Sequence, residues 1–490
     1  MIAWTIYVTF GGAVLLLFLP NVLARWMALL TALTGFAISL QGFFDNSDNA
    51  TFKTIVQLPW IRTLGFEYHL AVDGISLTMC LVTGLTAVSA VLFSWDVEER
   101  PNEFFFWLLL VVGGSYGVFL SADLFLLFVF YELVIVPKYF LIAIWGSTNK
   151  EYGAMKLTLY SFFGGALALI GILAIYVTAG GHTLDLQQLA QVQFAPQFQN
   201  WVFPVLFLGF AVLAGIWPLH TWAPTGHVAA PTAGSMLLAG IVMKLGAYAA
   251  LRVAMNLLPH GFQTWSKWIA VLGVIGIVYA AGVALRQRDL KFVIGYSSVS
   301  HMGFVLLGFA TANALGIGGA VLQMFSHGVI AALLFAVAGR MIYRRTHTRD
   351  LDTLSGMNLS HALPFAAFCF VVASAASMGI PGFSGFAAEI TILLGAWKSF
   401  PLAVLITGAG MVLVAAFTLR ALKKTFFSDV RVQQSRVPVD PEWNEHSAIS
   451  AAEKWGAGIL MFATLAAGLY PKLLLDRLLP AVEAMRFLKP

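Results

Sequence analysis

The residues of this sequence that could do chemistry are ionisable side chains inside long apolar runs. Glu132 lies in LFVFYELVIVPKYFL, Lys244 in GIVMKLGAY and Glu389 in GFAAEITILLG. A charge near the bilayer centre is costly, so each of these side chains should face a protein interior or a hydrated cavity. Because desolvation favours their neutral forms, such groups can take up and release protons near neutral pH. The alternative is a structural ion pair or a side chain that snorkels to the membrane surface.

Histidines form a second group. His301 (SSVSHMGFV) and His327 (QMFSHGVIA) lie in the middle of consecutive apolar runs, whereas His220 and His227 flank a proline-rich break. A neutral imidazole relays protons well, but it can equally be a hydrogen-bonded core residue. We expect a relay role for the first pair and consider the same role for the second. Haem ligation by two imidazoles would require histidines paired at matched depths, which the sequence does not show.

Lys138 is a further cation inside an apolar run, directly after Pro137. On a regular helix it would lie about 120° around the axis from Glu132. We expect its side chain to snorkel toward the nearer membrane surface. The other interpretation is a displaced positive charge that serves Glu132.

Composition places the chain in a membrane. Of its 490 residues 59% are hydrophobic and 10% charged, with a mean hydropathy of +0.84, which excludes an ordinary soluble globule. The net charge of +5 comes from basic residues scattered in short loops, so we expect no nucleic acid partner. Cys80 and Cys369 both lie in apolar runs, and no C-x-x-C spacing predicts a disulfide, a zinc site or an iron–sulfur cluster.

Segments of about 20 apolar residues predict an all-α integral membrane protein with about 14 transmembrane helices. Two of the segments are interrupted, one at GIWPLHTWAP and one at GIPGFSGF, and paired broken helices indicate inverted repeats with a functional site at their interface. The predicted ranges are 2–20, 22–43, 72–95, 104–120, 122–145, 156–179, 201–217, 232–257, 265–285, 291–311, 314–340, 362–398, 401–424 and 453–473.

Orientation follows from the basic residues, which are more frequent in the loops after the odd-numbered segments. Those loops should be cytoplasmic and both termini non-cytoplasmic. The range 425–452 is then a polar cytoplasmic connection, and 474–488 a short amphipathic tail. The first apolar run has no basic flank or small-residue cleavage site, so we expect a retained helix rather than a signal peptide.

Several longer strings resemble one known family. YELVIVPKYFLIAIWG, HTWAPTGHVAAPTAGSMLLAGIVMKLGAY, DLKFVIGYSSVSHMGFVLLG, QMFSHGVIAALLF, GIPGFSGFAAEITILLG and LAVDGISL are similar to the antiporter-like subunits of respiratory complex I, the proton-pumping NADH:quinone oxidoreductase. The resemblance covers nearly the whole chain. A glutamate on the second broken helix, here Glu389, marks the M-type subunit, or subunit 4.

The resemblance implies a proton relay through Glu132, Lys244, His301, His327 and Glu389 along a hydrated line at the membrane midplane. It implies helices 1–3 in 1–95, two inverted five-helix repeats in 104–257 and 265–424, and a last helix with its tail in 425–490. It further implies a multi-pass protein of the bacterial inner membrane, beside L-type and N-type antiporter-like subunits. The NADH, flavin, iron–sulfur and quinone sites would lie in partner subunits, and this chain would bind no cofactor or metal.

The sequence departs from the family pattern in its first half. Leu213 stands where the family has a lysine that pairs with the helix-5 glutamate, and Thr225 and Ala230 replace two acidic residues. These departures suggest a divergent or second M-type copy. The alternative functions are a subunit of a multisubunit cation/proton antiporter or bicarbonate-uptake module, or a spacer of the membrane arm that no longer pumps.

Overall fold

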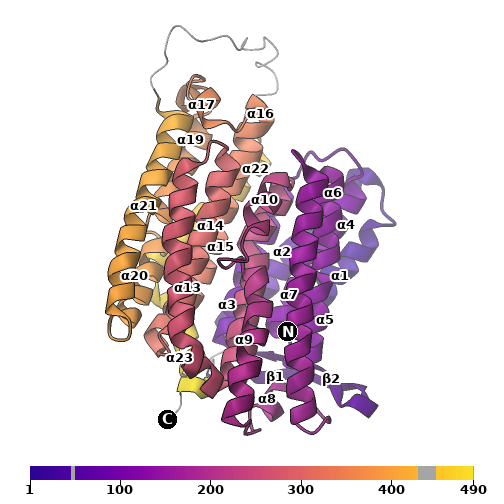
Figure 1. The fold of residues 1–490 in the computed structure, drawn as a ribbon. Coiled ribbons are helices and arrows are strands. Elements are labelled where there is room, and N and C mark those ends of the chain that lie inside the picture. Colours follow the sequence, from indigo (N-terminus) through magenta and orange to yellow (C-terminus); the bar gives the residue numbers. More distant parts are fainter. Residues whose placement is uncertain (46–49, 429–447, 489–490) are drawn as a thin grey trace.

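The computed structural model describes residues 1–45, 50–428 and 448–488, which form a bundle of long helices standing side by side (Figure 1). Apolar segments fold as helices because a backbone in lipid must satisfy its own hydrogen bonds. Within these residues, 11 helical segments are long and apolar enough to cross a membrane. They are α2 (Asn21–Asp45), α3 (Gly74–Leu92), α4 (Pro101–Leu120), α5 with α6 (Leu124–Leu133 and Ile135–Trp145), α7 (Lys150–Thr178), α9 (Pro196–Ala214), α11 to η3 (Thr232–Met255), α13 (Pro259–Arg286), α14 (Leu290–Ala310), α15 to α16 (Ala314–Thr346) and α21 (Pro401–Phe426).

The other predicted ranges also hold helices, but shorter or bent ones. They are α1 (Trp4–Leu16), the pair α19 (Pro364–Ser377) and α20 (Ser384–Trp397), and α22 (Ala451–Leu469), which bends by 71° into α23 (Lys472–Glu483). Counting that bent pair as one span gives up to 12 spans in the described part of the chain. The all-α membrane class is therefore confirmed, while the predicted range 2–20 holds a helix of only 13 residues and the range 362–398 is divided into two helices, as its predicted interruption implies.

Both predicted interruptions are present. Helix α9 ends at Ala214, and the chain resumes as α10 (Trp222–Ala229) after a turn that contains Pro218. Helices α19 and α20 are separated by residues 378–383. Gly215 and Gly379 begin the two turns with φ of 72° and 69°, a backbone region that residues with a Cβ adopt only with strain.

Three π-helical segments, which the sequence analysis did not predict, lie within the long helices. They are η2 (Leu238–Val242) and η3 (Ala250–Met255), on either side of α12 (Met243–Ala249), and η4 (Val337–Tyr343), which links α15 to α16 (Arg344–Thr346). Segment α11 (Thr232–Leu237) opens the helix that carries Lys244. π-Helical turns are rare and often mark functional positions.

One end of the bundle carries an antiparallel hairpin that the sequence analysis missed. Strands β1 (Lys53–Ile61) and β2 (Phe66–Val72) lie beside α8 at the lower end in Figure 1. His69 of β2 is bonded through Nδ1 to Asp185, the residue that caps α8, so the hairpin is tied to the bundle. The remaining short elements are η1 (Arg62–Leu64), α8 (Leu186–Leu189), α17 (Leu351–Leu354), α18 (Leu359–Ala362) and η6 (Arg486–Leu488).

The C-terminal predictions have different outcomes. Most of the predicted polar connection, residues 429–447, lies outside the described residues. Helix α23 is amphipathic as predicted for the tail, because Leu474 and Leu478 are buried while Lys472 and Asp476 are exposed.

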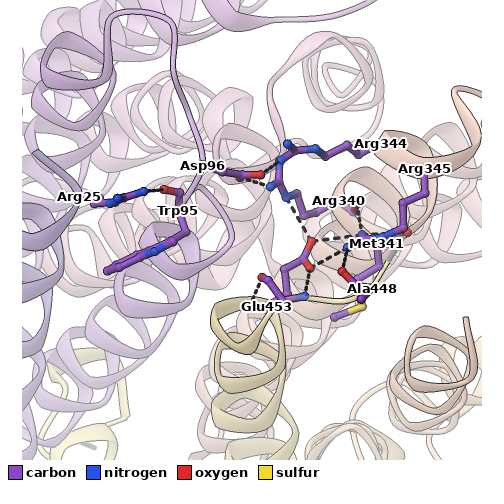
Figure 2. A network of polar contacts seen from close by, with 10 residues as sticks. Arg25, Trp95, Asp96, Arg340, Met341, Arg344, Arg345, Ala448 and Glu453 are labelled. Atoms are coloured by element: carbon purple, nitrogen blue, oxygen red, sulfur yellow. Dashed lines mark hydrogen bonds and ion pairs between the residues drawn. The ribbon is translucent and has the colours of Figure 1, made fainter. Parts of the chain in front are cut away.

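The opposite end is held together by an ion-pair network (Figure 2). Glu453, in the first turn of α22, is 2% exposed and lies 3.2 Å from Arg340 Nε and 2.9 Å from an Arg345 guanidinium nitrogen. Arg340 and Arg344 also pair with Asp96, which follows α3. The network therefore joins α3, the end of the α15 to α16 helix and the start of α22.

Substituting Glu453 by glutamine should destabilise the protein, because it leaves two guanidinium groups beside a buried neutral side chain. Breaking one partner of a buried ion pair costs about 3 kcal/mol. We expect a lower thermal unfolding midpoint in detergent for Glu453→Gln. The matched control is Glu151→Gln, because Glu151 also lies in the first turn of a helix, α7, but is exposed. Equal midpoints for the two variants would contradict a structural role for the network.

Candidate functional site

Lys244 is fully buried and forms the first contact of the candidate site. It lies in α12 and is 0% exposed. Its ammonium group donates to the Ala239 carbonyl and lies 2.6 Å from Nδ1 of His327 in α15. Ala239 belongs to the π-helical turn η2, and such turns can leave backbone carbonyl groups free of their usual helical partners. The lysine thus has two acceptors inside the protein and no need to reach water.

His301 of α14 is the next residue of the site and contacts His327. Its ring stacks on the His327 ring, with centroids 5.3 Å apart and planes 23° from parallel. Nδ1 of His301 lies 2.8 Å from the Ser297 carbonyl oxygen, and Nε2 lies 3.2 Å from the Ser377 carbonyl oxygen. A neutral imidazole carries one N–H and can donate to only one of these oxygens, whereas an imidazolium can donate to both. The surroundings of His301 therefore suit a ring that gains and loses a proton.

Glu389 of α20 ends this series of contacts. It is 3% exposed, and its Oε1 lies 3.6 Å from His301 Nε2. The interruption between α19 and α20 makes room for it, because a Cβ on Gly379 would collide with the Glu389 carboxylate. Four of the five residues predicted as the main relay thus form one buried series, Lys244, His327, His301 and Glu389, which we term the Lys–His–His–Glu chain.

Glu132 lies apart from the Lys–His–His–Glu chain. It sits in the last turn of α5 and is only partly buried. Its carboxylate lies against α7 at Gly165, where any Cβ would overlap with it. Its Oε1 has no hydrogen-bond partner among the described residues.

The substituted positions of the first half are apolar or neutral. Leu213 is buried in α9 and 1% exposed. The hydroxyl group of Thr225 accepts a hydrogen bond of 3.3 Å from Lys156 of α7. Neither of these two positions therefore carries a charge.

The expectation that Lys138 snorkels to a membrane surface is wrong. Its side chain is 2% exposed, and its ammonium nitrogen is buried without a hydrogen-bond partner in the described part of the chain. The regular helix stops at Leu133 and restarts as α6 at Ile135, so the direction of Lys138 does not follow from a continuous helix. Its side chain instead lines a small apolar pocket together with Gly234 and Val242.

His220 and His227 are buried, but no hydrogen bond joins them to the Lys–His–His–Glu chain among the described residues. Both ring nitrogens of each histidine lack a hydrogen-bond partner there. The His220 ring packs edge-on against Tyr279 at 5.5 Å, and the His227 ring stacks on Phe335 at 4.6 Å. A relay role for these two histidines therefore stays a prediction.

Sequence reasoning overlooked several buried cations, among them Lys291 and Arg252. Lys291 of α14 donates to the Ala230 carbonyl at 2.9 Å, and Arg252 lies 2.5 Å from the Asp73 carboxylate. Both basic residues lie near the ends of predicted segments, where lysine and arginine usually mark the membrane surface. Sequence position alone therefore gave no sign of their burial.

A further polar group lies at the hairpin end. Ligand atoms of Glu67, His69 and Asp185 lie within 4.8 Å of one another. The two ring nitrogens of His69 are, however, already bonded to Asp185 and to the Thr54 hydroxyl group. These hydrogen bonds explain the group as a tether of the hairpin.

The interrupted helices and the buried Lys–His–His–Glu chain define an antiporter-like membrane subunit. The family described as NADH:quinone oxidoreductase/Mrp antiporter, transmembrane, matches residues 121–415, and the chain belongs to this family. The chain is 38% identical over 457 residues to NAD(P)H-quinone oxidoreductase chain 4 1 of Synechococcus elongatus. The matched region covers 92% of this chain and 84% of the relative. The name of this relative agrees with the resemblance to subunit 4.

Solved structures share the fold. A chain of respiratory complex I from Thermus thermophilus with bound NADH superposes with a TM-score of 0.90 at 27% identity, over 100% of both chains. A chain of the Mrp complex from Dietzia sp. superposes with a TM-score of 0.83 at 21% identity, over 99% of this chain and 97% of that one. The second likeness is evidence of a common fold alone.

Replacing Gly379 by alanine should destabilise the interrupted helix. A residue with a Cβ at a positive φ costs about 1–2 kcal/mol, and the Glu389 carboxylate would also have to move. We expect a lower unfolding midpoint for Gly379→Ala. Gly408→Ala is the control, because Gly408 lies in the regular helix α21 with open space around its Cβ position. A Gly379→Ala midpoint at or above that of the control would show that the turn tolerates a side chain.

Proposed function

We propose that this chain is a proton-translocating membrane-arm subunit of a complex I-like NADH:quinone oxidoreductase. The observation that carries the proposal is the Lys–His–His–Glu chain, a series of exchangeable protons buried between α12 and α20. The relatives named as chain 4 of NAD(P)H-quinone oxidoreductase and the fold of the Thermus thermophilus complex I chain support it. The chain acts as part of an enzyme, with electron transfer in other subunits.

The contacts suggest the order of proton transfer. The Lys244 ammonium group gives a proton to His327 Nδ1 at 2.6 Å, which breaks one N–H bond and forms another. The imidazolium releases a proton from Nε2 toward the stacked His301, by way of water. His301 passes it from Nε2 to Glu389 Oε1. Each step moves one positive charge, and the buried surroundings make every added charge costly, so the series holds protons only transiently.

The first half carries Glu132 as its acidic relay residue, with His220 and His227 lining the way to Lys244. In this arrangement residues 104–257 and 265–424 are the two inverted repeats, residues 1–95 precede them, and 425–490 supplies the last helix and its tail. The presence of one interrupted helix in each half supports this division.

The surroundings of the subunit follow from the same proposal. The chain is a multi-pass protein of the bacterial inner membrane with both termini on the non-cytoplasmic side, and it contacts L-type and N-type antiporter-like subunits. The NADH, flavin, iron–sulfur and quinone sites belong to partner subunits. Affinity purification from mildly solubilised membranes should therefore recover NADH-oxidising and iron–sulfur subunits. Recovery of cation-antiporter subunits alone would overturn this assignment in favour of an antiporter or a bicarbonate-uptake module.

A second candidate is a spacer that fills the membrane arm without pumping. The buried Leu213, at the place of a lysine, favours it, because the first half then has no cation at the usual position. The intact Lys–His–His–Glu chain favours the pump.

Substituting Glu389 by glutamine tests the second half of the relay. Glutamine keeps the size of the side chain but cannot take up the proton from His301. We expect Glu389→Gln to assemble normally and to lower the number of protons translocated per quinone reduced, or to slow turnover. Proton uptake by inverted membrane vesicles measures this ratio. An assembled mutant with unchanged rate and ratio would exclude Glu389 from the relay.

Substituting Lys244 by methionine tests the start of the Lys–His–His–Glu chain. Methionine preserves most of the bulk, and replacing a buried charge by an apolar side chain is often neutral or stabilising. We expect Lys244→Met to assemble, with an unchanged or higher unfolding midpoint, and to lose proton translocation. Failure to assemble would instead identify Lys244 as a structural partner of His327.

A further inference from the structure

A pocket of about 20 Å³ lies between α14, α15, α19 and α21. It begins at Leu290, the first residue of α14, whose N–H donates to the carbonyl group of Arg349 at the end of the bundle that carries the Glu453 network. It extends to Ser297, seven residues further along α14, which corresponds to about 10 Å along the helix axis. The pocket thus reaches from near one end of the bundle to within one helical turn of His301.

Four hydroxyl groups line this pocket among apolar side chains, and three of them lack a hydrogen-bond partner within the described residues. The four belong to Ser297, Ser374, Ser377 and Thr418, and only that of Ser297 has a partner there. The other three residues are 0%, 1% and 5% exposed. Buried serine and threonine side chains in helices commonly donate to a carbonyl group one turn earlier, as Ser298 does in α14. An unpaired buried hydroxyl group is unfavourable, so the pocket should hold a partner for these three.

Water fits this pocket in size and in chemistry. A buried water molecule needs about 10–15 Å³ of free space and two to four polar partners, and the pocket offers both. No charged residue of the described chain lines it, so a neutral ligand is favoured over an ion. The pocket beside Lys138 differs, because among the described residues that lysine is its only polar side chain.

Ser297 connects the pocket to the His301 ring. Its carbonyl oxygen lies 2.8 Å from His301 Nδ1, and its hydroxyl oxygen lies 3.3 Å from the same nitrogen. Nδ1 can donate to the carbonyl oxygen when it carries a proton, and it can accept from the hydroxyl group when it does not. Nε2 lies 3.2 Å from the carbonyl oxygen of Ser377, whose side chain also lines the pocket. One serine at the pocket therefore provides a partner for Nδ1 in both of its protonation states.

A further hydroxyl group continues this line toward the end of the bundle. Thr425 lies one turn beyond Ala421, the last residue of α21 that lines the pocket, and seven residues beyond Thr418. Residues seven apart share one face of a helix. Thr425 is 1% exposed, its hydroxyl group has no hydrogen-bond partner among the described residues, and α21 ends one residue later. Buried hydroxyl groups thus follow one face of α21 from the pocket to the helix end.

We propose that this pocket binds one water molecule, held by its hydroxyl groups, through which His301 takes up protons from the end of the bundle that carries the Glu453 network. A proton that reaches the water is passed on when one O–H bond of the water breaks and a bond to the Ser297 hydroxyl oxygen forms. The Ser297 O–H bond breaks in the same step, and its proton binds to His301 Nδ1, so the water and the serine are both left neutral. This inference rests on the proposed function, because it assigns an entrance to the same Lys–His–His–Glu chain.

Thr418→Val tests the water site, because valine keeps the shape of the side chain and removes its hydroxyl group. In inverted membrane vesicles that contain the whole complex, we expect proton uptake coupled to quinone reduction to be about tenfold slower, which corresponds to a barrier about 1.4 kcal/mol higher. The difference should shrink as the medium is made more acidic, since a higher proton concentration offsets a slower uptake. Ser297→Ala, which removes the donor to Nδ1, should have the same effect.

Two controls separate the hydroxyl group from the packing around it. Thr418→Ser keeps the hydroxyl group and should retain most of the rate. Thr407→Val should leave the rate unchanged, because Thr407 is buried in α21 and its hydroxyl group also lacks a partner among the described residues, but it lies outside the pocket. An electron cryo-microscopy map of the unmodified complex should show a water molecule bonded to the hydroxyl groups of Ser374 and Thr418, and a dry pocket would overturn the inference.

The outcomes separate this inference from the proposed function. If Glu389→Gln impairs proton translocation while Thr418→Val and Ser297→Ala leave it unchanged, the entrance is overturned and the proposed function stands. If none of these variants changes translocation, the proposed function fails as well. A Thr418→Ser variant as slow as Thr418→Val, or loss of assembly in both Thr418→Val and Ser297→Ala, would also overturn the inference, because packing would then explain the effect.

Discussion

The bond between Lys244 and His327 is the interaction on which the rest of the site depends. An ammonium group cannot be buried in a helix bundle unless acceptors surround it, and here those acceptors are one imidazole and one backbone carbonyl. The carbonyl is provided by the π-helical turn η2, so the helix gives up some regular hydrogen bonding to hold the lysine. The π-helical turn and the buried lysine therefore occur together because the turn provides a carbonyl group that accepts from the ammonium group.

The same reasoning explains the interrupted helices. His301 approaches the carbonyl oxygen of Ser377, the last residue of α19, and that oxygen is available because the helix stops there. Gly379 then turns the chain and leaves room for Glu389. A continuous helix would offer only side chains to this region, so the break is what brings backbone polarity to the Lys–His–His–Glu chain.

Much of this arrangement could be predicted from the sequence, because its signals are strong in an apolar background. Lys244, Glu389 and the two central histidines were identified from residue type and position within apolar runs, and the two breaks from proline and glycine. What could not be predicted depends on geometry. The direction of Lys138 follows from a helix that stops and restarts, and the π-helical turns have no sequence signal. The hairpin at 53–72 lies between apolar runs, and the length of apolar runs, which predicts transmembrane helices, carries no information about strands.

Buried charged groups occur in two regions of the molecule, and their partners differ. In the Lys–His–His–Glu chain each ionisable group contacts the next, but only Lys244 and His327 are close enough for a direct hydrogen bond. In the first repeat, by contrast, Glu132 Oε1 and the Lys138 ammonium group have no hydrogen-bond partner among the described residues, and the lining of the small pocket beside Lys138 is apolar. A buried charge is stable only where acceptors or water replace the hydration that it has lost, so this second arrangement holds a charge less easily than the first. The difference in partners between the two regions is therefore a difference in the cost of their charged forms.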